Sequence, residues 1–313
     1  MTDTTLHIER IPPSRRLEAA RLMAGPGSDR RAAARFLSAA ESHGIALDDF
    51  WGVADETNGP FRAAALLVLS SGSTVMAFAS PVDGSASIES ISRMIDRACE
   101  EVKTGKLAQT LLEIDEAAAQ SAFERAGFVW VGDLLYLRRP WTKPEPMDGD
   151  WPTGVTIETW RQGDEEALAT ALERSYIDTQ DCPELCGLRS TQDVIESHRA
   201  TGVFDPALWW IVRANGAPAG VLLLNVAPDQ DHTELVYLGL GPELRGRGLA
   251  TRLLRHGLGA IALGKHRAMV CAVDARNGPA RKLYSREGFH EFSRRRALVR
   301  PIGRSVRQPP ATT

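Results

Sequence analysis

The sequence repeats itself, and this repeat limits the fold more than any other feature of the chain. The segments "FERAGFVWVGDLLYLRRP" (123–140) and "YSREGFHEFSRRRALVRP" (284–301) lie 161 residues apart. Four pairs of landmarks keep that interval: Gly127 and Gly288, Phe128 and Phe289, Pro140 and Pro301, and Pro81 and Pro242. Self-similarity at a fixed interval indicates duplicated structural units. We therefore expect two domains of the same fold.

Composition predicts where these domains begin and end. The stretch "PWTKPEPMDGDWP" (140–152) is rich in proline, as semi-rigid linkers are. The final "GRSVRQPPATT" has few apolar residues and is typical of a disordered tail. We expect domains at 1–140 and 153–301, a linker at 141–152 and a tail at 302–313.

The second copy alternates strand and helix patterns, which indicates an α/β (α+β) fold class. Apolar alternation predicts strands, and apolar residues at helical spacing predict helices. In chain order we expect a strand at 154–160, a helix at 163–177, a loop at 178–187, a helix from Ser190, two strands around the Asn215-Gly216 turn, a strand at 233–241, a helix from 249, a strand at 267–273, a helix at 278–287 and a strand at 290–300. Residues 48–71 of the first copy show the same strand, turn and strand.

The run "GPELRGRGLATRLL" (241–254) connects one of these strands to a helix. In a strand, glycine-rich turn and helix, backbone N–H groups converge on an anion at the positive end of the helix. The run is not a Walker A loop, because it lacks the lysine and the hydroxyl that follow the last glycine of that motif. It is not a dinucleotide fingerprint either, because "GRGLAT" ends in threonine. A different kind of phosphate site is predicted.

This run and a second motif resemble the signatures of the GNAT family of acyl-CoA-dependent N-acyltransferases. The family's Q/R-x-x-G-x-G/A signature is matched by Arg245, Gly246, Arg247, Gly248, Leu249 and Ala250. Its second signature is matched by Asn277, Ala280, Tyr284, Gly288 and Phe289. The resemblance covers residues 155–300 in element order. It implies two tandem GNAT-like domains, each with a mixed, mostly antiparallel central sheet flanked by helices.

The resemblance also implies the donor, acetyl-CoA, and the residues that bind it. Gly246 and Gly248 let the backbone approach the pyrophosphate, while the first turn of the helix offers free N–H groups. The strand around Leu238, Gly239 and Leu240 is expected to pair with the pantetheine amides, and Gly239 and Gly241 suggest a bulge or splay there. The other residues expected to bind the donor are Arg245, Arg247, Leu249, Ala250, Asn277 and Arg281. For Asn277, a helix cap is the alternative.

Acetyl transfer to an amine needs a base, because a lysine-like amine of pKa ~10.4 is almost entirely protonated at pH 7. Glu234 matches the glutamate that many family members carry on this strand, and His232 is the alternative base. Tyr284 matches the family's general acid, which protonates the leaving thiolate. Its alternative role is that of a helix residue packed on the core.

The loop before Ser190 falls where the family's specificity segment lies. Tyr176, Asp178, Asp181 and Glu184 are therefore candidates for contact with an acceptor amine. Their acidity suits a cationic acceptor, although charged loop residues are usually just solvated. The same loop carries Cys182 and Cys186, for which an apolar pair is favoured over zinc because the only nearby imidazole is His198. No metal is expected.

The first copy lacks these motifs. "GSASIE" (84–89) stands where the glycine turn is expected, Glu116 stands in place of Asn277, and Phe123 in place of Tyr284. We expect a degenerate scaffold without chemistry of its own. Tandem copies with one active half also occur in the mycothiol synthase branch of the family, but only this layout points to mycothiol.

Charge and hydropathy limit the partners. The net charge is −3, yet residues 245–313 carry 16 Lys and Arg against 3 Asp and Glu, which favours an anionic ligand near that region. The acidic balance and the few aromatic residues argue against nucleic acid, and no apolar run or signal peptide points to a membrane. We expect a cytoplasmic acetyl-CoA-dependent N-acetyltransferase acting on a primary amine by direct attack on the thioester. The alternative is an acyl-CoA-binding sensor without turnover, and the oligomeric state stays open.

Overall fold

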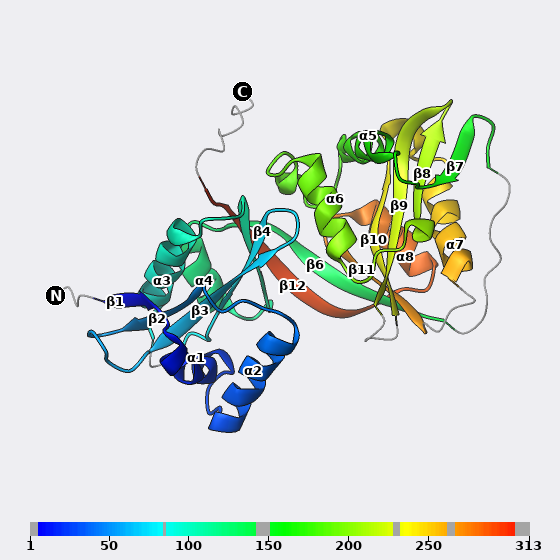
Figure 1. Ribbon diagram of the computed structural model, residues 1–313. Coiled ribbons are helices and arrows are strands. Elements are labelled where there is room, and N and C mark those ends of the chain that lie inside the picture. Colours follow the sequence, from blue (N-terminus) through cyan, green and yellow to red (C-terminus); the bar gives the residue numbers. More distant parts are fainter. Residues whose placement is uncertain (1–5, 84–85, 142–150, 228–231, 262–266, 304–313) are drawn as a thin grey trace. The chain divides into compact units, whose positions relative to one another are not determined.

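The computed structural model describes residues 6–83, 86–141, 151–227, 232–261 and 267–303. Most of the expected linker and tail therefore lies outside the described residues. The chain forms two compact units: unit 1 comprises residues 1–130 and 296–313, and unit 2 comprises residues 131–295. In Figure 1 each unit is a sheet flanked by helices, as expected from the sequence.

Unit 1 has its strands in the order β1-β2-β3-β4-β5-β12, in which β4 and β5 are parallel and the other neighbours are antiparallel. A core built on α3 and α4 covers one face, and α1 and α2 cover the other. The elements are β1 (His7–Arg10), α1 (Arg16–Met23), α2 (Arg30–Ser42), β2 (Phe50–Ala54), β3 (Ala63–Ser70), β4 (Thr74–Ala79), α3 (Ile88–Glu101), β5 (Leu107–Leu112) and α4 (Ala117–Arg125).

Unit 2 repeats this plan in the order β6-β11-β10-β9-β8-β7, and only β10 and β11 are parallel. Helices α7 and α8 pack on one face, and α5 and α6 pack on the other. The elements are β7 (Val155–Thr159), α5 (Glu165–Tyr176), α6 (Thr191–Ala200), β8 (Trp209–Ala214), β9 (Ala217–Ala227), β10 (His232–Leu240), α7 (Leu249–Ile261), β11 (Ala268–Asp274) and α8 (Gly278–Arg286). The mixed, mostly antiparallel sheet expected from the sequence is confirmed.

The last strand of each copy belongs to the sheet of the other copy. Strand β6 (Val129–Pro140) follows the elements of unit 1, yet it pairs with β11 from Ala268 to Asp274. Strand β12 (His290–Pro301) ends the second copy, yet its residues from Arg296 onward pair with β5. The units therefore differ from the contiguous domains 1–140 and 153–301. Because the two strands descend from one repeated pattern, each fits either sheet, so the sequence alone does not reveal the exchange.

Local signals in the sequence fold as their chemistry predicts. Asn215 and Gly216 have φ of +49° and +84°, which is the two-residue hairpin turn expected between β8 and β9. Ser190 caps α6 by accepting a hydrogen bond from the Asp193 amide, and the Asp193 side chain caps the Ser190 amide in return. These turns and caps fix the lengths of the elements that carry the candidate site.

Equivalent aromatic pairs anchor the equivalent helices of the two units. In α4, Phe123 packs on Phe128 with ring centroids 5.0 Å apart. In α8, Tyr284 packs on Phe289 at 5.3 Å. The helix that carries the candidate acid thus has a matching but hydroxyl-free partner in unit 1, which supports the interpretation of the repeat as a duplicated fold.

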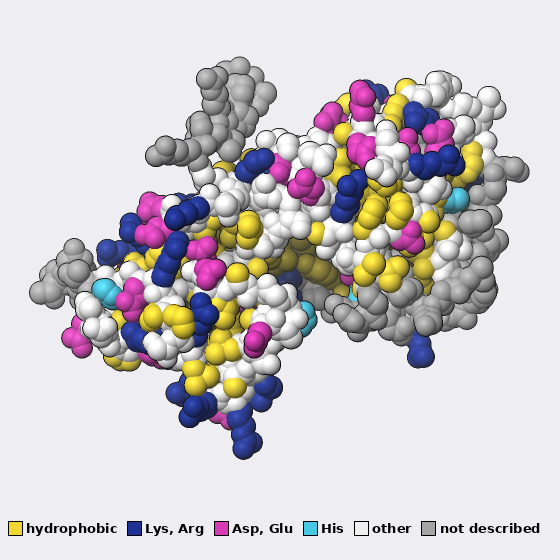
Figure 2. Space-filling view, in the orientation of Figure 1, with side chains coloured by type: hydrophobic (Ala, Val, Ile, Leu, Met, Phe, Trp, Pro, Cys, Tyr) yellow, Lys and Arg dark blue, Asp and Glu magenta, His cyan; other side chains and the backbone are white. Residues whose placement is uncertain are grey.

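Basic side chains also occur well outside the C-terminal quarter of the sequence. Figure 2 shows them gathered over α2, where Arg30, Arg31 and Arg35 are exposed. The sequence asymmetry therefore does not translate into one basic and one acidic half. Among the helices that the structure describes, none has the length and apolar character needed to cross a bilayer.

Candidate active site

Strands β10 and β11 part soon after they begin to pair. Their register includes only Thr233 with Met269 and Glu234 with Val270. Beyond these residues β10 stays paired with β9 up to Leu240, while β11 stays paired with β6. Among the described residues, no strand therefore pairs with the β10 backbone from residue 235 onward on its β11 side. The splay expected from the sequence is present, and it begins directly after Glu234.

The irregularity in β10 is not at its glycine. The register with β9 shifts between Leu235 and Tyr237, which is a bulge. At Gly239, a Cβ atom would lie 2.7 Å from the Ser175 Oγ atom of α5 and 2.5 Å from the Tyr237 ring. Gly239 therefore permits close packing of α5 on the strand, and the bulge at Val236 turns Tyr237 toward that helix.

The glycine turn is open and carries the backbone geometry that its sequence predicts. Gly246 and Gly248 have φ of +72° and +75°, and no atom of the described residues lies within 4 Å of a Cβ built on either one. Residues 246–248 are exposed, and α7 begins at Leu249, which is buried. The free N–H groups of the first helical turn thus face an accessible surface, as an anion site requires.

The two arginines of the turn have different surroundings. Arg245 donates from Nε to the Leu240 carbonyl at 2.9 Å, from Nη2 to the Ser175 carbonyl at 2.9 Å and from Nη1 to the Asp178 carbonyl at 3.5 Å. It therefore braces the end of β10 against the end of α5. Arg247 is exposed, and no described residue forms an ion pair with it.

Glu234 and His232 form a pair on β10. The His232 Nε2 atom lies 2.8 Å from the Glu234 Oε1 atom, with side-chain exposures of 5% for the histidine and 28% for the glutamate. Among the described residues, His232 is the sole side chain recorded as bonded to this carboxylate. The buried imidazole thus contacts one oxygen of a partly exposed carboxylate, on the last residue of β10 that pairs with β11.

Tyr284 is buried on the α7–α8 side of the sheet. Burial raises its pKa well above the ordinary value, and Cys271, Asp181 and Tyr237 nearby raise it further. No described residue forms a hydrogen bond with the Tyr284 hydroxyl, and its raised pKa keeps this hydroxyl protonated. On β11, Val270 lies opposite Glu234 in the strand register, while the next residue, Cys271, belongs to the same core cluster as Tyr284.

Asn277 caps α8. Its Oδ1 atom accepts a hydrogen bond from the Ala280 amide at 3.2 Å, and its Nδ2 atom lies 3.5 Å from Asp181 Oδ1. The cap interpretation is confirmed, and a pantetheine contact stays a prediction. Arg281 is exposed on the same helix and donates to the Ala275 carbonyl at 3.0 Å.

Two acidic residues of the loop before α6, Asp181 and Glu184, are bound within the chain. The Asp181 carboxylate accepts a hydrogen bond from the Asp274 amide at 2.9 Å, and burial raises its pKa. Glu184 pairs with Arg276 at 2.7 Å, and this guanidinium lowers the pKa of Glu184. The Glu184 charge is therefore already neutralised, and its expected role toward a cationic acceptor stays a prediction that the geometry weakens.

Asp274 and Arg276 hold this loop in place, and sequence reasoning missed both. Burial alone would raise the pKa of the fully buried Asp274, but hydrogen bonds from Arg276 and the Cys182 amide lower it overall. Cys182 adopts a left-handed backbone, φ +43°, and its thiol is buried, whereas Cys186 is exposed. The expected apolar cysteine pair is thus only half present. No cluster suited to a metal ion occurs among the described residues.

An aromatic cluster fills the α5–α6 side behind the splay. Tyr237 exchanges a hydrogen bond with Ser175 at 2.9 Å, contacts Tyr176 with ring centroids 5.9 Å apart and stacks on His198 at 5.6 Å. Burial raises the pKa of Tyr176 to about 12. Tyr176 is half-buried, whereas Asp178 is exposed. Nothing in the sequence singled out Tyr237, because the bulge that turns it inward has no sequence signal.

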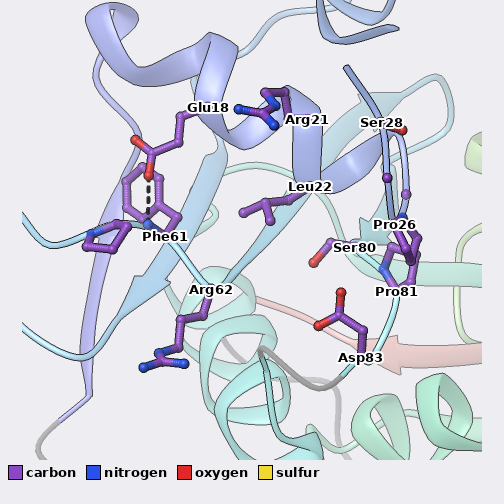
Figure 3. Close-up of a pocket in the computed structure, with 13 residues that line it drawn as sticks. Glu18, Arg21, Leu22, Pro26, Ser28, Phe61, Arg62, Ser80, Pro81 and Asp83 are labelled. Atoms are coloured by element: carbon purple, nitrogen blue, oxygen red, sulfur yellow. Dashed lines mark hydrogen bonds between the residues drawn. The ribbon is translucent and has the colours of Figure 1, made fainter. Parts of the chain in front are cut away.

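Unit 1 has a hollow of about 420 Å³ near the counterpart of the glycine turn (Figure 3). Three of its polar side chains already bond within the unit: Glu18 accepts a hydrogen bond from the Phe61 amide at 2.7 Å, Ser80 accepts one from the Ala64 amide at 3.1 Å, and Arg62 pairs with Asp55. We therefore assign it no ligand. Residues 84 and 85, part of the counterpart of the glycine turn, lie outside the described residues.

Comparisons with known proteins point to acetyltransferases. The profile described as the Acetyltransferase (GNAT) family matches residues 169–289. A mycothiol acetyltransferase of Streptomyces griseus is 27% identical over 186 residues, which are 59% of this chain and 59% of that protein. A mycothiol acetyltransferase of Thermomonospora curvata is 31% identical over 182 residues, 58% of this chain and 59% of that protein. The match thus spans less than two thirds of these relatives.

Solved structures resemble the chain over nearly its whole length. A GCN5-related N-acetyltransferase from Sphaerobacter thermophilus has a TM-score of 0.59 at 20% identity and covers 98% of each chain. A tandem GNAT protein from the clavulanic acid biosynthesis pathway has a TM-score of 0.52 at 15% identity and covers 96% of this chain and all of its own. At such identities the likeness concerns the fold. With the two signatures in unit 2 and the duplicated plan, these findings make the chain similar to the GNAT acetyltransferase family in the sequence of residues 169–289 and to tandem GNAT proteins in its fold.

Proposed function

We propose that unit 2 transfers an acetyl group from acetyl-CoA to the primary amine of a small-molecule acceptor. The parting of β10 from β11 directly after Glu234 carries this proposal. A pantetheine arm in that opening would pair with the free β10 backbone at Leu238–Leu240. Its pyrophosphate would meet the exposed turn at Gly246 and Gly248, where the helix N-terminus favours an anion. Arg247 would add a cation, whereas Arg245 would keep the turn in place.

The chemistry is direct attack of the amine on the thioester. The new C–N bond forms as the C–S bond breaks, the amine proton passes to the Glu234 carboxylate, and the Tyr284 hydroxyl supplies a proton to the leaving thiolate. His232 orients the glutamate through the 2.8 Å contact. A positioned base contributes roughly 10²–10⁴ in rate, because so little of the amine is neutral near pH 7.

The names of the relatives support a small-molecule acceptor. We propose an amine of the kind that mycothiol acetyltransferases acetylate, entering from the α5–α6 side on which Glu234 and the aromatic cluster lie. Tyr176 and Asp178 are the loop residues best placed to contact it, since Asp181 and Glu184 are engaged by Asp274 and Arg276.

A thiol-release assay tests the proposal. The full chain is incubated with acetyl-CoA and a panel of amines that includes the mycothiol acetyltransferase acceptor, amino sugars and polyamines, and free thiol is measured over time. Acetyl-CoA-dependent release with at least one amine is expected. Binding of acetyl-CoA with no release for any amine would favour the sensor alternative, and absence of binding would overturn the site.

The glycine turn offers a sharp control. Gly248→Asp places a carboxylate where phosphates are expected and should abolish acetyl-CoA binding, measured by calorimetry as one site per chain in the parent. Gly248→Asn has the same size without the charge, and asparagine tolerates a positive φ better than most residues. We expect the asparagine variant to retain most of the affinity. Equal affinity in the parent and a folded Gly248→Asp variant would refute the pyrophosphate site.

A further inference from the structure

Unit 2 also has a hollow, of about 580 Å³. It lies away from the splay, beside the connection from β7 to α5 and the connection from α6 to β8. Its walls combine aromatic, apolar and charged side chains. Those that matter for binding are Trp160, Arg161, Glu165, Arg199, Phe204 and Pro206.

Arg199 lies against two aromatic rings in this hollow and has no bonding partner among the described residues. Its guanidinium carbon lies 5.0 Å from the centroid of the Trp160 ring and 5.3 Å from that of Phe204. The Arg199 Nε and Nη2 atoms and the Trp160 Nε1 atom are buried without any hydrogen-bond acceptor in the described part of the chain. Buried donors are nearly always satisfied in folded proteins, and leaving a cationic donor unsatisfied is costly. Arg199 and Trp160, which carry these three donors, both line the hollow, and the described residues supply no acceptor for them.

The charged side chains around the hollow also favour an anion, because two arginines and one glutamate line it. No ion pair to Arg199 occurs within the described residues, and the exposed Arg161 adds a second cation to the rim. The acidic side chain that lines the hollow, Glu165, accepts a hydrogen bond from the Gly163 amide at 2.9 Å. It is therefore occupied at the start of α5 rather than at Arg199.

A buried layer separates this hollow from the splay. Trp160 packs on Trp209 with ring centroids 6.5 Å apart, and the Trp209 Nε1 atom donates to Asn225 Oδ1 at 2.9 Å. Asn225 in turn lies opposite Glu234 in the strand register. Because Trp209 and Asn225 are fully buried, a ligand in the hollow does not touch Glu234.

We propose that this hollow binds a small apolar carboxylate, whose carboxyl group pairs with Arg199 while its apolar part packs on Phe204 and Pro206. The accessible part of the guanidinium receives the first oxygen, and a small rotation brings the second oxygen to Nη2. The site is distinct from the proposed acetyl-CoA opening and does not depend on acetyl transfer.

The test titrates the full chain with phenylacetate and with its neutral isostere phenylacetamide, by calorimetry and by ligand-observed NMR. One phenylacetate site per chain is expected, bound at least about tenfold more tightly than the amide because the ion pair is lost in the isostere. Saturating acetyl-CoA should leave the affinity unchanged. Equal binding of acid and amide, displacement by acetyl-CoA, or no binding at millimolar concentration would overturn the proposal.

Variants separate a ligand site from a merely structural arginine. Arg199→Met keeps an unbranched stem on the two rings and removes the unpaired cation, so we expect phenylacetate binding to fall at least about tenfold while the unfolding midpoint does not fall. Arg161→Met, on the exposed rim, is the matched control and should change the affinity by less than about threefold. A clear loss of stability in Arg199→Met without loss of binding would show that Arg199 is structural. If Arg199→Met does not fold, the difference between acid and amide in the parent chain decides alone.

Discussion

In the proposed mechanism Glu234 accepts a proton and Tyr284 donates one, so variants of the two residues should differ in their pH profiles. Glu234→Gln keeps a group able to bond His232 but cannot accept a proton, so kcat should fall by about 10²-fold or more near pH 7. The loss should shrink as the pH approaches the pKa of the acceptor amine, because the free base is then abundant. Tyr284→Phe removes only the donor and should lower kcat with acetyl-CoA affinity nearly intact. Equal, pH-independent losses in both variants would mean that the base is misassigned, and His232 would be tested next.

Burial of His198 lowers the stability of the fold at acidic pH. Burial lowers its pKa to about 4, helped by the nearby Arg189, and its Nε2 atom has no partner within the described chain. Between about pH 6.5 and pH 4, His198 is protonated in the unfolded chain but not in the folded chain. The free energy of unfolding therefore falls as the pH drops through this range, by up to about 3 kcal/mol. His198→Phe keeps the stack on Tyr237 without the titration. Its free energy of unfolding, measured by urea titration from pH 4 to 7, should depend less steeply on pH than that of the parent, and parallel curves would contradict the assignment.

At the scale of elements, the turn before α7 has a brace and a charge that mutation can separate. Arg245→Ala removes donors to three backbone carbonyls and should cost about 2 kcal/mol of stability. Arg247→Ala should leave stability within about 0.5 kcal/mol of the parent. It should nevertheless weaken acetyl-CoA binding at low salt, and this loss should narrow as salt screens the charge. Thermal unfolding and calorimetry at two ionic strengths check both expectations. A stable Arg245→Ala variant with impaired binding would instead make Arg245 a phosphate ligand.

The elements themselves were largely predictable, and their contacts only partly so. The strands, helices and hairpin of unit 2 follow from apolar periodicity and from local chemistry such as Ser190 and Asn215-Gly216. The glycine turn and the splay follow from the motif. The bulge at Val236, the Arg245 brace and the Asp274–Arg276 pair depend on residues far apart in sequence meeting in space. Periodicity contains no information about such contacts between distant residues. For this reason the sequence predicted Glu184 as a candidate acceptor contact, whereas in the fold it pairs with Arg276.

At the scale of the whole molecule, the exchange of β6 and β12 makes each unit depend on the other half of the chain. Truncation after Arg295 removes the strand that pairs with β5, together with Leu298, which is fully buried in the core of unit 1. Losing such a side chain alone costs about 2–5 kcal/mol. We expect β5 to lose its hydrogen-exchange protection while β11 keeps it, as read by mass spectrometry. Truncation after Gly303 is the control and should change neither strand. Retained protection of β5 in the shorter chain would refute the pairing.

The exchange also sets an order of events during synthesis. The ribosome releases the chain from its N-terminus, yet residues 296–301, which complete the sheet of unit 1, emerge only after residues 131–295 of unit 2. The edge of β5 in unit 1 therefore stays unpaired while unit 2 is translated. Unpaired strand edges promote aggregation of incomplete chains. Unit 2, in contrast, receives β6 from sequence made before its own first strand. The unit that bears the glycine turn is thus complete once residue 295 has emerged, whereas unit 1, which is made first, is completed only afterwards.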